Sequence, residues 1–223
     1  MNDLDKNRKL KFFQRFKKGL QYNINIDPGR IMALTDGIFG MVMTLLIFAM
    51  ALPEMEIASN AGFVNFIYSI LPTIGITLVS FFLLSSFWIC HHEFIKIDKL
   101  DLPYLWLNIL FLATISFIPF TTSLIGNYSQ FFLAEVIFGL NILLSIIIFS
   151  LMFSYANKRG FLKSEIGAKE KKYIHHTLLI IMASTVAINL LDFNLNSNFI
   201  YLFLLIPIIS TLRDIQFRMK KYE

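Results

Sequence analysis

Residues 30–50 read RIMALTDGIFGMVMTLLIFAM, an apolar stretch that begins with an arginine and carries Asp36 inside it. As a helix, the stretch is long enough to cross about 30 Å of hydrocarbon. An ionised carboxylate inside hydrocarbon is costly unless a partner stabilises it. Asp36 therefore predicts polar partners on the helices beside this one.

The rest of the chain is equally apolar. Of its 223 residues 56% are hydrophobic and only 16% are charged, with a mean hydropathy of +0.64. These values indicate an all-α integral membrane protein. Six transmembrane helices are expected near residues 31–52, 66–90, 103–125, 131–155, 174–191 and 198–212. Pro207 is expected to interrupt the last of them, whose helical pattern extends to Phe217.

The positive charges predict the topology. All 20 Lys and Arg residues fall in residues 1–30, 91–102, 156–173 and 213–223, which six spans place on one side of the membrane. The opposite connections carry none. Both termini are therefore predicted to be cytoplasmic. The net charge of +5 reflects this topology and does not indicate a nucleic-acid partner.

Three segments are expected. Residues 1–29 form a basic cytoplasmic segment, in which Leu10, Phe13, Phe16 and Leu20 recur at helical spacing, as in a helix that lies at the membrane interface. Residues 30–217 form the six-helix transmembrane domain, and residues 218–223 form a basic tail. A cleaved signal peptide is disfavoured, because the charged region is long and no small-residue cleavage site follows it.

Polar residues on the first three spans lie at one depth near the cytoplasmic side. Because consecutive spans are antiparallel, a single polar layer is predicted, with Arg30 at its mouth and Thr35, Asp36, Trp88, His91, His92 and Asn108 inside it. Indole, imidazole and amide N–H groups would satisfy the Asp36 carboxylate and lock the helices together. Other deep polar residues are expected to hydrogen-bond between helices: Ser80, Ser85, Ser86, Asn141, Ser184 and Asn189.

Three stretches together, RIMALTDGIFGMVMTLLIFAMALP, SFWICHHEF and LWLNILFLATISFIPFTTSLIG, resemble the prokaryotic branch of the transmembrane protein 175 family of endolysosomal-type potassium channels. The first helix of that family carries an Arg, three intervening residues and then Phe-Ser-Asp. Arg30 and Asp36 keep this register, whereas Leu34 and Thr35 replace the Phe and the Ser. The loss of the aromatic side chain affects the packing expected at that position.

The resemblance implies a cation channel that favours potassium over sodium and lacks a TVGYG filter. It implies a homotetramer in the prokaryotic plasma membrane, with the first helix of each subunit lining a central pore. The expected partners are copies of the same chain and membrane lipid, and no cofactor is expected besides the permeant potassium ions. The resemblance places the constriction at Met41, Leu45 and Phe48, with Thr44 beside it.

Helical geometry identifies an apolar line on the first span. At about 100° per residue, a single line along the helix has six residues within about 40° of it: Leu34, Gly37, Met41, Leu45, Phe48 and Leu52. Asp36 lies roughly 140° from this line and is therefore expected to face packed helices. Taken alone, such a line more often faces lipid or the bundle core, and it is the resemblance that favours a pore.

Two other classes of protein remain as alternatives. An ion- or proton-coupled transporter could use Asp36 with His91 or His92, but such carriers generally place ionisable groups near the midplane, which is uncharged here. An enzyme or metal site could use the two histidines. Adjacent residues on a helix point about 100° apart and cannot face one metal as an i, i+4 pair can, so catalysis is disfavoured.

Overall fold

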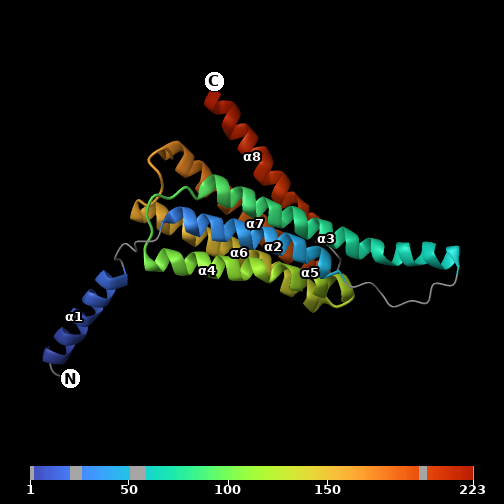
Figure 1. The fold of residues 1–223 in the computed structure, drawn as a ribbon, viewed down its shortest axis with the longest axis horizontal. Helices are drawn as coiled ribbons and strands as arrows, with labels where there is room; N and C mark the ends of the chain where they lie inside the picture. Colours follow the sequence, from blue (N-terminus) through green and yellow to red (C-terminus); the bar gives the residue numbers. More distant parts are fainter. Residues whose placement is uncertain (1–2, 21–26, 51–58, 196–199, 223) are drawn as a thin grey trace.

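The computed structural model describes residues 3–20, 27–50, 59–195 and 200–222, and helices account for most of them (Figure 1). Six segments are long and apolar enough to cross a membrane, which confirms the predicted all-α, six-span fold. In chain order the helices are α1 (Asp3–Leu20), α2 (Pro28–Phe48), α3 (Asn60–Phe94), α4 (Leu102–Ser116), α5 (Ile118–Asn127), α6 (Phe132–Arg159), α7 (Ala168–Leu195), the 3-10 helix η1 (Ile200–Leu204) and α8 (Leu205–Tyr222).

The helix α2 begins with a side-chain cap. The Asp27 carboxylate accepts a hydrogen bond from the Gly29 N–H at 3.0 Å, and Pro28 occupies the first turn, where no intrahelical donor is needed. The helix ends at Phe48, short of the predicted end at residue 52. Leu52, which the sequence placed on the apolar line, lies outside the described residues.

The next helix, α3, is longer than its predicted range of 66–90. It begins at Asn60, after Ser59 accepts a hydrogen bond from the Gly62 N–H at 3.0 Å, and it has 35 residues. At 1.5 Å per residue, this length exceeds the thickness of a bilayer core. Its N-terminal part accordingly extends beyond the other helices of the bundle (Figure 1).

The third span is not one helix, as predicted, but two. The break between α4 and α5 lies at Phe117, two residues before Pro119. Proline has no N–H to donate to the carbonyl four residues earlier, and its ring clashes with that carbonyl. The chain therefore restarts as α5, with Pro119 in its first turn.

The sixth span is interrupted near Pro207, as predicted. The chain runs as the 3-10 helix η1 up to Leu204, and Pro207 then lies in the first turn of α8. Proline is tolerated there for the same reason as in α5. The helix continues past Phe217 to Tyr222, so residues 218–222 are a helical extension rather than a separate tail.

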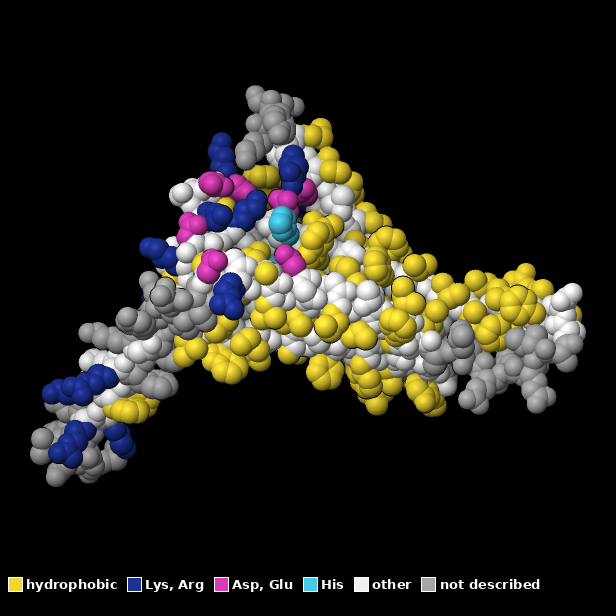
Figure 2. Space-filling model, in the orientation of Figure 1, with side chains coloured by type: hydrophobic (Ala, Val, Ile, Leu, Met, Phe, Trp, Pro, Cys, Tyr) yellow, Lys and Arg dark blue, Asp and Glu magenta, His cyan; other side chains and the backbone are white. Residues whose placement is uncertain are grey.

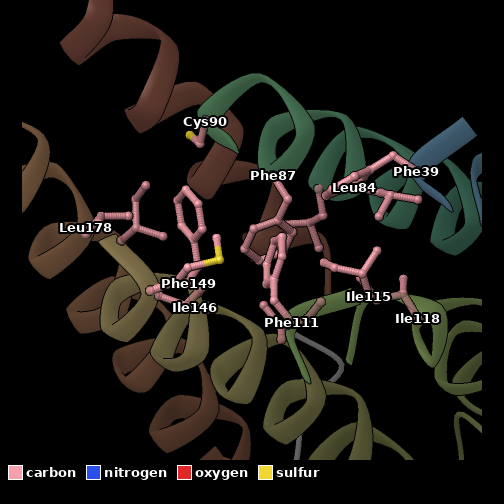
Figure 3. Packing of buried hydrophobic residues seen from close by; sticks show 14 of the residues in the cluster. Phe39, Leu84, Phe87, Cys90, Phe111, Ile115, Ile118, Ile146, Phe149 and Leu178 are labelled. Atoms are coloured by element: carbon pink, nitrogen blue, oxygen red, sulfur yellow. The ribbon is translucent and has the colours of Figure 1, made fainter. Parts of the chain in front are cut away.

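The core is built around α6, which packs against α4, α5 and α7. Large aromatic rings fill it: Phe111 of α4 stacks on Phe149 of α6 with ring centroids 5.3 Å apart, and Phe87 of α3 meets Phe111 edge-on at 6.5 Å (Figure 3). From α2, Phe39 approaches Phe111 at 6.0 Å. One face of α2 is thereby attached to the bundle.

Hydrogen bonds between helices supplement this packing. Four of the six residues predicted to form them do so: Ser80 with Thr122 at 2.8 Å, Ser86 with Ser210 at 3.1 Å, Asn141 with Thr121 at 3.3 Å and Asn189 with the Gly139 carbonyl at 3.5 Å. Ser85 instead donates to the Phe81 carbonyl of its own helix. Ser184 bonds none of the described residues.

The two ends of the bundle differ in charge. Figure 2 shows Lys, Arg, Asp and Glu side chains gathered at the end from which α1 extends, whereas the sides are hydrophobic. The helix α1 covers the predicted basic amphipathic segment, with Leu10 and Phe13 exposed. The side chains of Phe16 and Leu20 lie outside the described residues. That this end faces the cytoplasm stays a prediction.

Candidate functional site

The helix α2 has two distinct faces. One face is buried against the bundle and consists of Ile31, Thr35, Phe39, Val42 and Leu46. The opposite face includes Met41, Leu45 and Phe48, whose side chains are 60%, 45% and 83% exposed. The residues named from the sequence as the constriction therefore point away from their own subunit. They can line a pore only if further copies of the chain surround it.

A hydroxyl group lies beside this exposed face, that of Thr44, and the residue is exposed. Its hydroxyl donates to the Met41 carbonyl at 2.7 Å. The hydroxyl hydrogen is therefore occupied, and the oxygen lone pairs are what Thr44 can offer outward. An oxygen presented in this way can act as a ligand for a cation, whereas it offers no donor to an anion.

Two glycines share the outward half of α2. A Cβ atom built at Gly37 or at Gly40 would meet no other atom within 4 Å. Neither glycine is therefore required for packing inside the subunit. Together with the exposed apolar side chains, they leave this half of the helix uncovered by its own chain.

The residues predicted to form a single polar layer fall into two separate groups. In the outer part, the Trp88 indole N–H donates to an Asp36 carboxylate oxygen at 3.0 Å, and the Trp88 ring stacks on His92 with centroids 6.0 Å apart. Asp36 is exposed in the subunit, so the expectation that it faces packed helices was wrong. Thr35, the preceding residue, lies on the packed face of α2. Because consecutive helical residues point about 100° apart, Asp36 lies on the flank of α2 beside α3.

The inner part of the layer is buried. The Asn108 amide donates to the Thr35 hydroxyl at 3.3 Å, and Thr35 in turn donates to the Ile31 carbonyl at 2.9 Å. His91 is also buried, but its ring lies parallel to that of Phe111 with centroids 5.8 Å apart, and neither ring nitrogen has a hydrogen-bond partner among the described residues. Neither a histidine nor Asn108 hydrogen-bonds Asp36, contrary to expectation.

Arg30 lies on the exposed side at the start of α2. Its guanidinium forms no ion pair or side-chain hydrogen bond with the described residues, and its backbone N–H bonds the Asp27 carbonyl at 3.0 Å. A long, exposed basic side chain at the end of a membrane span can extend to the polar interface. Arg30 and Asp36 are thus not joined within one subunit.

One buried cluster was missed in the sequence. Asp101 is fully buried, caps α4 by accepting from the Tyr104 N–H at 3.1 Å, and also accepts the Tyr155 hydroxyl at 2.7 Å. The Arg159 Nε lies 3.4 Å from the same carboxylate. This cluster ties the loop before α4 to the end of α6. The sequence Asp-Leu-Pro is a typical helix start and could have identified the cap.

Comparisons with known proteins show which proteins this chain resembles. Residues 30–119 match the family described as the endosomal/lysosomal potassium channel TMEM175. The chain is 32% identical over 103 residues to a protein named as a potassium channel of Chamaesiphon minutus, and 27% identical over 103 residues to one of Streptomyces collinus. These matches cover 46% of this chain and only 51% and 49% of the two relatives.

A third relative matches over a greater length. A protein named as a potassium channel of a Chryseobacterium species is 26% identical over 156 residues, which cover 67% of this chain and 77% of the relative. The matched region again contains membrane-spanning segments rather than the basic N-terminal segment alone, since it is far longer than residues 1–29.

The fold itself also has a solved counterpart. It matches the crystal structure of a lysosomal potassium-selective channel TMEM175 homolog from Chamaesiphon minutus, with a TM-score of 0.63 and 23% identity over 83% of this chain and 96% of that one. At this identity the match establishes a shared fold. Together, the family match over residues 30–119, which contain all of α3 and α4, the bacterial relatives and the shared fold support placing this multi-pass membrane protein with the bacterial members of the TMEM175 family.

Proposed function

We propose that this protein is a potassium-favouring cation channel, formed by four copies of the chain around a central pore that α2 lines. The observation that carries the proposal is the exposed apolar face of α2, within the region that matches the family. The named activity of the relatives, which this chain spans only in part, adds support. The proposed location is the prokaryotic plasma membrane, with both termini in the cytoplasm.

Conduction is passive in this proposal. Rings of Met41, Leu45 and Phe48 from the four subunits form an apolar constriction, which closes by losing water and opens by a small rotation or separation of the helices. An ion that passes an apolar ring sheds part of its hydration shell. Potassium holds its water less tightly than sodium, so a narrow apolar ring favours potassium without carbonyl ligands.

The hydroxyl of Thr44 has a supporting role. Because the hydroxyl hydrogen is donated to the Met41 carbonyl, the oxygen lone pairs remain available. They would partly replace lost water as an ion enters the constriction. The ring of four such oxygens would favour cations over anions. The permeant potassium ion is the substrate here, and no other cofactor is proposed.

The polar layer is proposed to hold α2 in place. The bonds Trp88–Asp36 and Asn108–Thr35 connect α2 with α3 and α4, respectively. Helices connected on one side keep a fixed rotation about their axes, which sets the residues that face the pore. Three further residues are proposed to have structural roles in this layer. Arg30 lies at its mouth, His91 lies among the core aromatic rings, and His92 stacks on the Trp88 ring.

Cysteine accessibility tests which face of α2 lines the pore. The native Cys90 is buried and carries no disulfide, so the wild-type protein is expected to be insensitive to a charged, membrane-impermeant thiol reagent. Met41→Cys and Leu45→Cys channels should lose most of their current after modification, because the added group would block a narrow pore.

Matched controls come from the other faces of the same helix. Val42→Cys, on the buried face, and Ile47→Cys, on the flank near Asp36, are expected to keep their currents. Block of Ile47→Cys without block of Met41→Cys would assign a different face to the pore. Equal insensitivity of all four variants would remove α2 from the conduction path.

A further inference from the structure

A groove follows α3 and α8 toward the charged end of the bundle. Two cavities, of about 250 and 280 Å³, have Glu93, Phe94 and Asp214 in common, so they adjoin one another. Away from the charged end the groove continues into a more open apolar depression. The side chains that line this depression are Phe82, Leu204, Pro207, Ile208, Thr211 and Leu212.

The chemistry of the groove changes along its length. The depression is almost entirely apolar, as an acyl chain requires. The middle contains hydroxyl groups, and one pair of them, Ser86 and Ser210, joins α3 to α8 at 3.1 Å. The end contains ionised groups of both signs. This order of apolar, neutral polar and charged groups matches the order along a phospholipid.

The charged end is described by its ion pairs. Arg218 bridges the two helices, with one nitrogen 3.1 Å from the Glu93 carboxylate and another 2.7 Å from that of Asp214. Lys96 lies 3.7 Å from Glu93. The third carboxylate of this cavity, Glu170 of α7, forms no ion pair with the described residues.

The balance of charge selects the headgroup. Among the side chains that line this cavity, three carboxylates face two cations, with Arg213 5.6 Å from the ring of Tyr173, which also lines it, and positive and negative groups are interleaved on the surface (Figure 2). A purely anionic headgroup would be repelled by the extra carboxylate. A headgroup with both a phosphate and a cation fits, and a cation with N–H donors fits best because carboxylates accept hydrogen bonds.

We propose that the α3–α8 groove binds one phosphatidylethanolamine molecule per subunit. An acyl chain would lie along the apolar depression, the phosphate would accept from the remaining N–H groups of Arg218 and Lys96, and the primary ammonium would donate to Glu170. Phosphatidylcholine lacks these donors, and phosphatidylglycerol lacks the cation. The site is independent of the pore, so its failure would leave the proposed channel activity unaffected.

Native mass spectrometry of the purified full-length protein tests this site. The protein would be stripped of lipid in mild detergent and titrated with phosphatidylethanolamine, phosphatidylcholine or phosphatidylglycerol of identical acyl chains. We expect one saturable phosphatidylethanolamine per subunit, bound roughly tenfold more tightly than either competitor, as about one charge-assisted hydrogen bond would give.

Two variants localise the binding. Glu170→Gln should reduce the preference for phosphatidylethanolamine over phosphatidylcholine about five- to tenfold, whereas Glu165→Gln, an exposed carboxylate outside the groove at the same end, should leave it unchanged. Thr211→Trp, which places a large ring in the apolar groove, should abolish the saturable binding of all three lipids while the unfolding temperature stays the same.

Three results would each overturn the assignment. Tighter or equal binding of phosphatidylglycerol would show that the carboxylates do not select the headgroup. Equal effects of Glu170→Gln and Glu165→Gln would place the lipid elsewhere. Dissociation of the oligomer by Thr211→Trp would mean that a second copy of the chain, rather than a lipid, occupies the groove.

Discussion

Simultaneous replacement of Met41, Leu45 and Phe48 by alanine is expected to increase the ion leak and to lower the preference for potassium over sodium roughly tenfold, equivalent to about 1.4 kcal/mol. The three side chains are exposed on the face that would surround the pore. Shortening them widens the constriction, so both ions keep more of their water and the difference between their hydration energies matters less. A wider apolar ring also fills with water more easily, which holds the pore open.

Conductance and bi-ionic reversal potential, measured in planar bilayers, check this expectation. The matched control is Ile47→Ala, which shortens another exposed apolar side chain of α2 on a different face. It should behave like the wild-type channel. If the triple variant conducts and discriminates as the wild type does while eluting as the same oligomer, the three residues do not form the constriction.

Asp101→Asn is expected to destabilise the folded subunit by about 1–3 kcal/mol, because the fully buried carboxylate is replaced by an amide that cannot satisfy the same partners, while the partly exposed Arg159 loses its ion pair. The carboxylate is fully buried and has three polar partners, the Tyr104 N–H, the Tyr155 hydroxyl and Arg159. An amide keeps the size of the side chain but has no negative charge and replaces one acceptor oxygen with a donor. The loop before α4 would then be held less firmly against the end of α6.

Thermal unfolding of the purified protein in detergent measures this effect. Asp98→Asn is the control, because Asp98 is an exposed residue of the same loop whose backbone N–H bonds the Phe161 carbonyl at 2.9 Å. That bond is unaffected by the substitution, so little change in unfolding temperature is expected. Equal unfolding temperatures for the two variants would show that the Asp101 cluster contributes no stability.

The six spans could be predicted from the sequence because length and hydropathy alone determine whether a helix can cross a membrane. Residues such as Pro119 and Pro207 limited this prediction. Both were visible, and both lie in the first turn of a new helix, Pro119 in α5 and Pro207 in α8, yet only the break near Pro207 was predicted. The pattern of apolar residues continues across both prolines and does not locate where one helix ends and the next begins.

Of the partners predicted for Asp36, the Trp88 indole donates to its carboxylate, whereas the histidines and Asn108 do not. Depth follows from the number of residues between a side chain and the end of its span, which the sequence gives for Asp36, Trp88 and Asn108. Partners depend on how each helix is rotated, and one residue of difference turns a side chain by about 100°. Thr35 is therefore buried beside Asn108, whereas Asp36 is exposed beside Trp88.

The Asp101 cluster could be predicted only in part. The helix start after Asp101 has a local signal, since a capping residue and a proline adjoin it in the chain. Tyr155 lies 54 positions away, and only the packing of α4 on α6 brings it to the carboxylate. A single sequence contains no local signal for such a contact.

The reversal potential of the purified protein in a planar bilayer, with potassium on one side and sodium on the other, tests the central proposal most directly. A potassium-favouring pore predicts a steady current that reverses close to the potassium equilibrium potential, without any coupled substrate or proton gradient. A current that reverses near zero would contradict the selectivity. Absence of current, together with uptake that requires a proton or ion gradient, would contradict the channel and favour a carrier that uses Asp36 and the histidines.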